Sequence, residues 1–147
     1  KEKRKSHLKN MHGLIDQMKD SFLNQIDSQG LSNVSNAYFV KTAEALGHYL
    51  SHSIKINKIR RFLDAFRRIE IAEYYDPDSV SLVRPKLAYA VGRSGYEERD
   101  FMQRFMNFLD PILKRVSDTT DRKNFEKSLK FVESIIAYHR FYGGVDS

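Results

Sequence analysis

Glu44, His48 and His52 have the spacing that a metal site on a helix would require. They recur every four residues, which would place three potential ligands on one helical face. The zinc-protease pattern, however, needs a glutamate directly after the first histidine, and Tyr49 stands there. We therefore interpret the two histidines as solvent-facing or core-edge residues and predict no metal site.

His139 and four acidic residues supply the remaining candidates for catalysis. His139 could serve as a general base in a nuclease, but the sequence offers it no partner, so we expect it to pack or to form a hydrogen bond near a helix end. The carboxylates around the Asp76-Pro77-Asp78 turn suit a charged helix terminus better than a Mg²⁺ site. They belong to Glu70, Glu73, Asp76 and Asp78.

Other motifs that carry catalysis are absent from the sequence. Cysteine does not occur, which excludes a disulfide, a thiolate metal site and a cysteine nucleophile. The sequence also contains no glycine-rich phosphate loop, nucleophile elbow or kinase motif. We therefore predict a binding protein without a cofactor rather than an enzyme.

Length and charge favour one folded, basic domain. The chain has 147 residues, and 25 Lys and Arg against 19 Asp and Glu give it a net charge of +6, which favours a polyanionic partner. No apolar run approaches the roughly 18 residues of a membrane span, so we expect a cytoplasmic protein without membrane contact. We predict a single helical domain over residues 1–147, in which residues 1–6 form a flexible basic end.

The elements that must position these side chains are helices. Prolines and glycines are few, and apolar residues recur at three-and-four spacing, so we predict an all-α, compact single-domain bundle of five or six helices. The first segment carries one narrow apolar stripe, made of Leu8, Met11, Ile15, Met18, Phe22 and Ile26. The later helices are expected at about 36–51, 56–75, 84 to 92–95, 96–116 and 121–142.

Helix-breaking and capping residues refine these boundaries. Pro77 disfavours helix at the residue before it, and Pro111 should kink or divide the helix that contains it. Ser94 stands three residues before Glu97, the spacing of a capping box. Gly143-Gly144 should end the last helix in a left-handed turn.

The third helix concentrates positive charge. At 100° per residue, its apolar residues fall on one arc, and the opposite arc is basic, with Asp64 as the acidic neighbour. The small Ala65 on this side would let a phosphate backbone approach between long basic arms. The basic residues are Lys58, Arg60, Arg61, Arg67 and Arg68.

The fourth helix repeats the pattern in RPKLAYAVGR, which begins at Arg84. Lys86, Tyr89 and Arg93 share one face, while Leu87 and Val91 point elsewhere. An aromatic ring between two cations can stack on a base while the cations hold phosphates. The alternative is that Tyr89 is a partly buried core tyrosine between solvated charges.

Three stretches carry a family resemblance. They are KINKIRRFLDAFRRIE from Lys55, RPKLAYAVGR from Arg84 and FVESIIAYHRFYGG from Phe131. Together they resemble the small helical subunit of the type III-A CRISPR effector, the Csm complex. The resemblance implies a non-catalytic subunit, present in several stacked copies, that lines the channel holding guide RNA paired with target RNA. It also implies that cleavage belongs to other subunits.

The resemblance also implies which side chains face RNA. Position by position, it points to Lys58, Arg60 and Arg61 in the KIRRF stretch and to Lys86 and Arg93, whereas Arg67 and Arg68 follow from the helical wheel alone. The predicted partners are guide RNA, target RNA, other subunits and neighbouring copies of the chain, and a homodimer of the free protein stays open. The alternative hypothesis is a structural subunit of another complex that associates through the first-helix stripe and the terminal aromatic residues.

Overall fold

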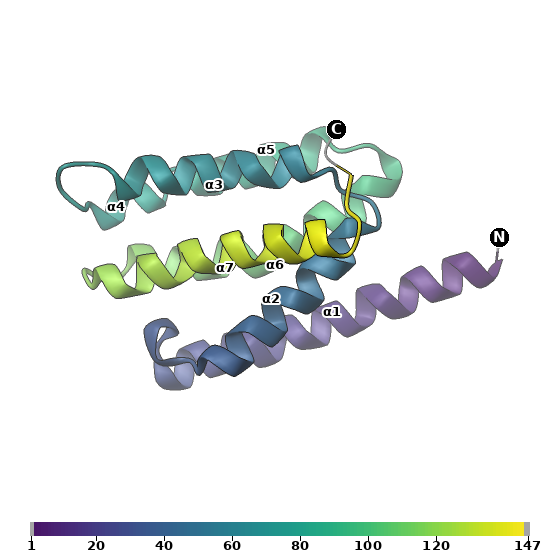
Figure 1. Cartoon of the computed structure of the whole chain (residues 1–147), viewed down its shortest axis with the longest axis horizontal. Coiled ribbons are helices and arrows are strands. Elements are labelled where there is room, and N and C mark those ends of the chain that lie inside the picture. Colours follow the sequence, from purple (N-terminus) through teal and green to yellow (C-terminus); the bar gives the residue numbers. More distant parts are fainter. Residues whose placement is uncertain (1, 146–147) are drawn as a thin grey trace.

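Helices account for most of residues 2–145, which are the residues that the computed structural model describes, and no strand occurs among them (Figure 1). The predicted all-α class is therefore confirmed. Six of these helices have 11 residues or more, and α4 adds a single turn that the sequence did not predict. The elements are α1 (Glu2–Gln29), the 3₁₀ helix η1 (Leu31–Asn33), α2 (Asn36–Ser51), α3 (Ile56–Glu70), α4 (Pro77–Val80), α5 (Val83–Arg93), α6 (Tyr96–Ser117) and α7 (Arg122–Phe141).

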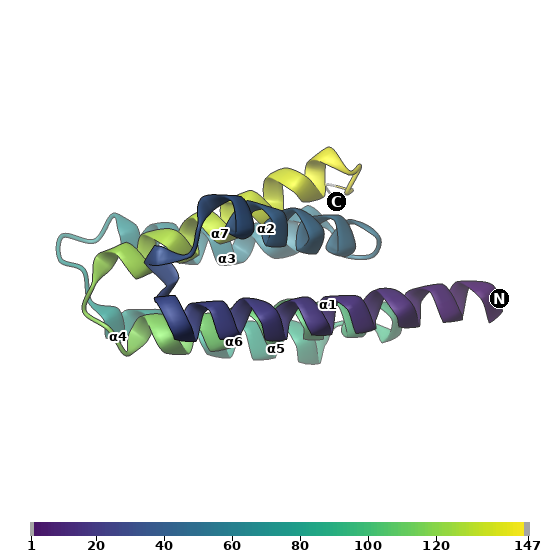
Figure 2. The ribbon, with the colours of Figure 1, turned by 90° about the horizontal axis from the view of Figure 1, so that it is seen from below.

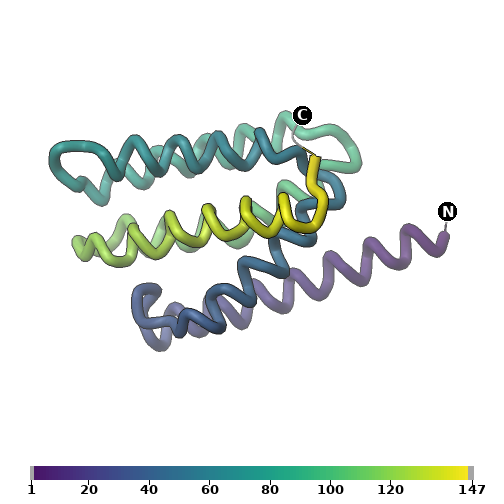
Figure 3. The backbone as a smooth tube through the Cα atoms, in the orientation of Figure 1, coloured from purple at the N-terminus to yellow at the C-terminus, as the bar shows by residue number. Residues whose placement is uncertain are grey.

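The long helices form two layers. In one layer α7 lies between α2 and α3, and in the other α6 lies between α1 and α5 (Figure 2). The first residues of α1 extend beyond the other helices at one end of the molecule (Figure 3). The basic end predicted at residues 1–6 is thus helical from Glu2 onward, while Lys1 lies outside the described residues. At the other terminus, the backbone N–H of Ile56 donates to the Val145 carbonyl, which ties the chain end to the start of α3.

Aromatic rings fill the space between the layers. Phe131 of α7 is fully buried, and its ring centroid lies 5.1 Å from that of Phe22 in α1 and 5.5 Å from that of Phe39 in α2. The predicted apolar stripe of α1 faces this core: Ile15, Phe22 and Ile26 are buried, and the other stripe residues are partly buried against the same cluster. α1 therefore packs the buried part of its stripe inside the molecule, while Leu8, Met11 and Met18 stay partly exposed.

Tertiary packing changes three predicted boundaries. α3 ends at Glu70 instead of near Tyr75, because the chain turns there and Asp76 caps α4, accepting a hydrogen bond from the Asp78 backbone N–H at 3.0 Å. α6 is not divided at Pro111, since buried residues on both sides of the proline anchor the helix in the core. The capping box is also wrong: Ser94 Oγ donates to the Ala90 carbonyl at the end of α5. Gly143, with φ of 87°, ends α7 as predicted.

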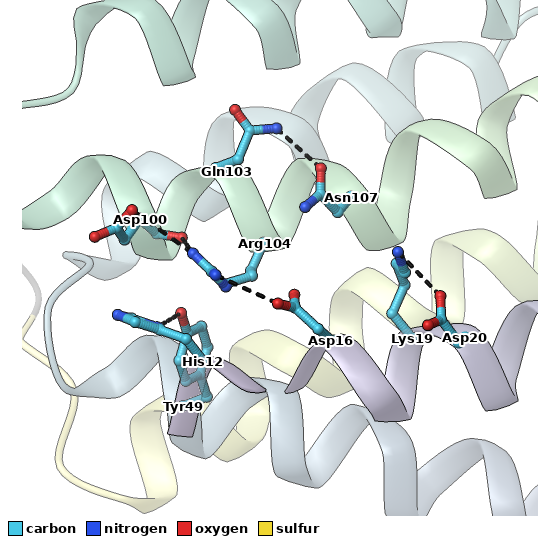
Figure 4. A network of polar contacts seen from close by, with 9 residues as sticks. All are labelled: His12, Asp16, Lys19, Asp20, Tyr49, Asp100, Gln103, Arg104 and Asn107. Carbon is cyan, nitrogen blue, oxygen red and sulfur yellow. Dashed lines mark hydrogen bonds and ion pairs between the residues drawn. The ribbon is translucent and has the colours of Figure 1, made fainter. Parts of the chain in front are cut away.

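A polar network joins α1, α2 and α6 (Figure 4). The ring nitrogen Nδ1 of His12 and the buried hydroxyl of Tyr49 lie 2.5 Å apart. Beside them Arg104 reaches Asp16 of α1 at 3.3 Å and Asp100 of its own helix at 3.6 Å. Burial lowers the pKa of His12, and the charge of Arg104 lowers it further, while Asp100 and Asp16 raise it. The neutral imidazole is therefore the form that the folded state favours.

This network predicts that acid weakens the fold. Because the pKa of His12 is lower in the folded protein than its ordinary 6.5, the unfolded chain binds the proton more readily, and stability is lost as pH falls through about 6.5. We expect the urea midpoint of unfolding to fall between pH 7.5 and 5.5, and to fall less in a His12→Asn variant. The variant should keep part of the pH dependence of its stability, since burial also lowers the pKa of His52. Equal pH profiles for the two proteins would show that His12 is not responsible.

Candidate nucleic-acid interface

The helices α3 and α5 enclose a groove that collects most of the predicted site residues. We call it the α3–α5 groove. It has a volume of about 560 Å³. Its charged and aromatic lining comprises Lys58, Arg61, Asp64 and Arg68 of α3 and Lys86, Tyr89 and Arg93 of α5. Its apolar lining comprises Phe62, Pro85 and Ala90.

Helical periodicity explains why these side chains meet. Lys58, Arg61 and Arg68 follow one another at intervals of three and seven, and Lys86, Tyr89 and Arg93 at three and four, so each set lies along one helical face. The neighbouring faces are buried: Phe62 and Phe66 on α3, and Leu87 and Val91 on α5. The two basic faces therefore border the same seam where α3 packs against α5.

The groove has an excess of positive charge. Lys58 is paired with Glu98, whose two carboxylate oxygens lie 2.6 and 2.7 Å from its Nζ. No ion pair joins Arg61, Arg68, Lys86 or Arg93 to any residue in the range 2–145. Asp64 is the acid that lines the groove. Four guanidinium or ammonium groups are thus free to meet an anionic ligand.

Arg60 and Arg67 do not line the groove. Both are exposed, but Arg67 Nη2 lies 3.9 Å from Glu133 of α7, on the other side of α3. Arg60 and Arg67 are seven residues apart and lie about 100° around α3 from Arg61 and Arg68. Of the five predicted basic residues, Lys58, Arg61 and Arg68 line the groove, and RNA contact by Arg60 and Arg67 stays a prediction.

The structure also decides the roles proposed for Ala65 and Tyr89. Ala65 is 5% exposed and belongs to the core, so the prediction that it opens a path for a phosphate backbone is wrong. Its small side chain instead lies within the packing of α3. Tyr89 is 67% exposed, which overturns the alternative of a core tyrosine. Its ring is available at the groove.

The histidines considered for catalysis have structural partners. Glu44 accepts a hydrogen bond from the Tyr142 hydroxyl at 2.6 Å, and His48 stacks on the Tyr142 ring with centroids 4.0 Å apart. Between Glu2 and Val145, no group of three or more metal-binding side chains is arranged to hold an ion. His139 is fully buried, with Nε2 2.5 Å from the Ile54 carbonyl oxygen, which confirms the expected packing role.

One group of exposed apolar residues lies between α3 and α5, and Leu14 of α1 is also exposed, at 61%. Ile71, Tyr74 and Leu82 are 79%, 80% and 70% exposed, and all three lie in the segment that joins α3 to α5. Of the terminal aromatic residues, Phe141 is exposed, whereas Tyr142 is held by Glu44 and His48. None of the helices described here has the length and apolar character to cross a membrane.

A family model and a known protein both match this chain. The family model described as Csm2 Type III-A matches residues 33–145, a range that contains α2 to α7 and leaves α1 outside. A Streptococcus thermophilus protein named CRISPR system Cms protein Csm2 is 24% identical over 102 residues, which make up 68% of this chain and 79% of that protein. Both matches agree with the resemblance carried by the three sequence stretches.

Proposed function

Since the chain belongs to the Csm2 family of type III-A CRISPR proteins, and is thus a small subunit of that effector, we propose that it holds RNA by its backbone in the α3–α5 groove. The ligand is guide RNA, target RNA or the pair of them. The chain's other partners are further subunits of the complex. Its role is structural: it positions RNA, and cleavage takes place elsewhere.

The observation that carries this proposal is the convergence of unpaired cations on one groove. Lysine and arginine side chains neutralise phosphates without reading sequence, whereas discrimination between sequences requires contacts to base edges. Arg61, Arg68, Lys86 and Arg93 are placed for the first kind of contact. In such a complex the guide reads the target by base pairing, and the protein needs to recognise only the backbone.

Salt dependence provides the test. We expect Arg68→Gln combined with Lys86→Gln to weaken binding of a fluorescent single-stranded RNA about tenfold at about 0.15 M salt. Each lost phosphate contact should lower the slope of log affinity against log salt by about 0.7, so the double variant should lose about 1.4. Fluorescence anisotropy at several salt concentrations measures both quantities.

The matched control removes the same charge elsewhere. Lys41 on α2 and Lys130 on α7 are exposed and do not line the groove. Lys41→Gln combined with Lys130→Gln should leave the slope near that of the natural sequence. If the groove and control variants behaved alike, the α3–α5 groove would not be the RNA site. The chain would then serve the complex through contacts with other subunits alone, for which Ile71, Tyr74 and Leu82 supply exposed apolar surface.

A further inference from the structure

The α3–α5 groove has an apolar part that phosphate contacts do not use. Phe62, Pro85 and Ala90 line it together with the ring of Tyr89. Phosphate groups are hydrated anions and gain nothing from such a surface. A basic ridge alone would have been enough to hold an RNA backbone, so the apolar lining calls for another part of the ligand.

The size and composition of the groove suit a nucleobase. Its volume of about 560 Å³ lies within the roughly 300–1,000 Å³ that is typical of small-molecule pockets. Proteins that bind single-stranded RNA combine cations for the backbone with aromatic side chains on which unstacked bases lie. Tyr89 is exposed at 67%, so its ring is open to such a base.

The cations are distributed along the groove instead of gathering at one point. α3 and α5 run antiparallel, because the short segment containing α4 joins the end of one to the start of the other (Figure 1). Arg68 and Lys86 therefore lie toward the α4 end, and Lys58 and Arg93 toward the other. Ten residues of α3 separate Lys58 from Arg68, a rise of about 15 Å. Phosphates on both sides of one base can thus be neutralised while the base lies between them.

We infer that the α3–α5 groove takes one unstacked RNA base against Tyr89 and the apolar wall, with the flanking phosphates on the cations at its two ends. This inference rests on the proposed function and adds a requirement for the base. It predicts that the chain prefers single-stranded or bulged RNA to an uninterrupted duplex, whose bases are stacked and out of reach.

Abasic RNA separates the base from the phosphates. We compare oligouridine with an oligomer of the same length that has the same ribose-phosphate backbone and no bases. A stacked base contributes about 1–3 kcal/mol, so the natural sequence should bind oligouridine at least fivefold more tightly than the abasic oligomer. Tyr89→Ala should abolish this preference, and Tyr89→Phe, which keeps the ring, should retain it.

An exposed tyrosine outside the groove serves as the control. Tyr74 is 80% exposed and does not line the groove, so Tyr74→Ala should leave the preference for oligouridine unchanged. Circular dichroism of the variants should show that both alanine proteins remain helical, since neither side chain belongs to the core.

The possible outcomes distinguish the two proposals. Equal affinity for oligouridine and abasic RNA, with both affinities lowered by Arg68→Gln and Lys86→Gln, would overturn the inference about the base and leave the phosphate contacts standing. A preference for bases that survives Tyr89→Ala would place the base elsewhere and also overturn the inference. Failure of both oligomers to bind at 50 mM salt would overturn both proposals.

Discussion

Replacing Phe22 with alanine is expected to lower the free energy of unfolding by about 3–5 kcal/mol, the cost of removing a buried phenyl ring. Phe22 is fully buried, and its ring centroid lies 5.1 Å from that of Phe131, 6.3 Å from that of Phe108 and 6.0 Å from that of Tyr38. The truncation would leave a cavity where α1 packs against α2, α6 and α7. Domains of this size are stable by only about 5–15 kcal/mol, so the variant should be close to unfolding at 37 °C.

Urea denaturation followed by circular dichroism measures this loss. Phe141→Ala is the matched control, because Phe141 is 75% exposed, and its truncation should change the free energy of unfolding by no more than about 0.5 kcal/mol. Phe22→Leu fills part of the cavity and should give an intermediate loss, which keeps the comparison measurable if the alanine variant does not fold. Similar losses for Phe22→Ala and Phe141→Ala would mean that α1 does not fold as one unit with the other helices.

Phe22 also shows that α1, which lies outside the family match, is part of the same core. Phe22 lies before residue 33, where the match begins, yet its ring contacts Phe108 and Phe131 inside the matched range. Apolar periodicity alone identified the α1 stripe, because a helix that packs on a core needs apolar side chains at three-and-four spacing whatever their identities. The structure adds the partners of the stripe, which periodicity does not contain.

The α3–α5 groove could be predicted only in part, because periodicity does not show which helices pack together. A helical wheel gives directions around one axis, and it placed the basic residues of α3 opposite its buried apolar face. It gives no information on which neighbouring helix lies beside each basic residue. Arg67 contacts Glu133 on a different helix, α7. The groove likewise depends on contact between two helices, α3 and α5. Long-range packing therefore decided which of the predicted cations share a site.

Local signals failed where tertiary contacts outweighed them. Pro111 removes one backbone donor from α6, but Phe108 and Ile112 are buried on either side and hold the helix together. Ser94 and Glu97 have the spacing of a capping box, yet Ser94 bonds to Ala90 because α5 ends only two residues before Gly95. Gly143 ends α7 as predicted, with a left-handed φ of 87°. Glycine has no side chain and adopts such an angle without strain, so this signal does not depend on tertiary contacts.

Replacing Gly47 with alanine is expected to destabilise the fold by about 2–3 kcal/mol, although alanine is the better helix former. A Cβ atom at position 47 of α2 would lie 2.7 Å from the Ile135 carbonyl oxygen and 3.0 Å from the His139 nitrogen, both backbone atoms of α7. Backbone cannot rotate away as a side chain does, so α2 and α7 would have to separate. The strain should outweigh the roughly 1 kcal/mol that alanine contributes to helix propensity.

Gly13→Ala is the control, and we expect it to change stability in the opposite direction to Gly47→Ala. Gly13 also lies inside a helix, α1, but a Cβ atom there would meet nothing within 4 Å. Helix propensity then acts alone, and the free energy of unfolding should rise by about 0.5–1 kcal/mol. Urea denaturation of the two variants compares one chemical change in two environments. Stabilisation by both substitutions would show that α2 and α7 do not pack as closely as the structure indicates, whereas opposite signs would assign the effect at Gly47 to the close approach of the two helices.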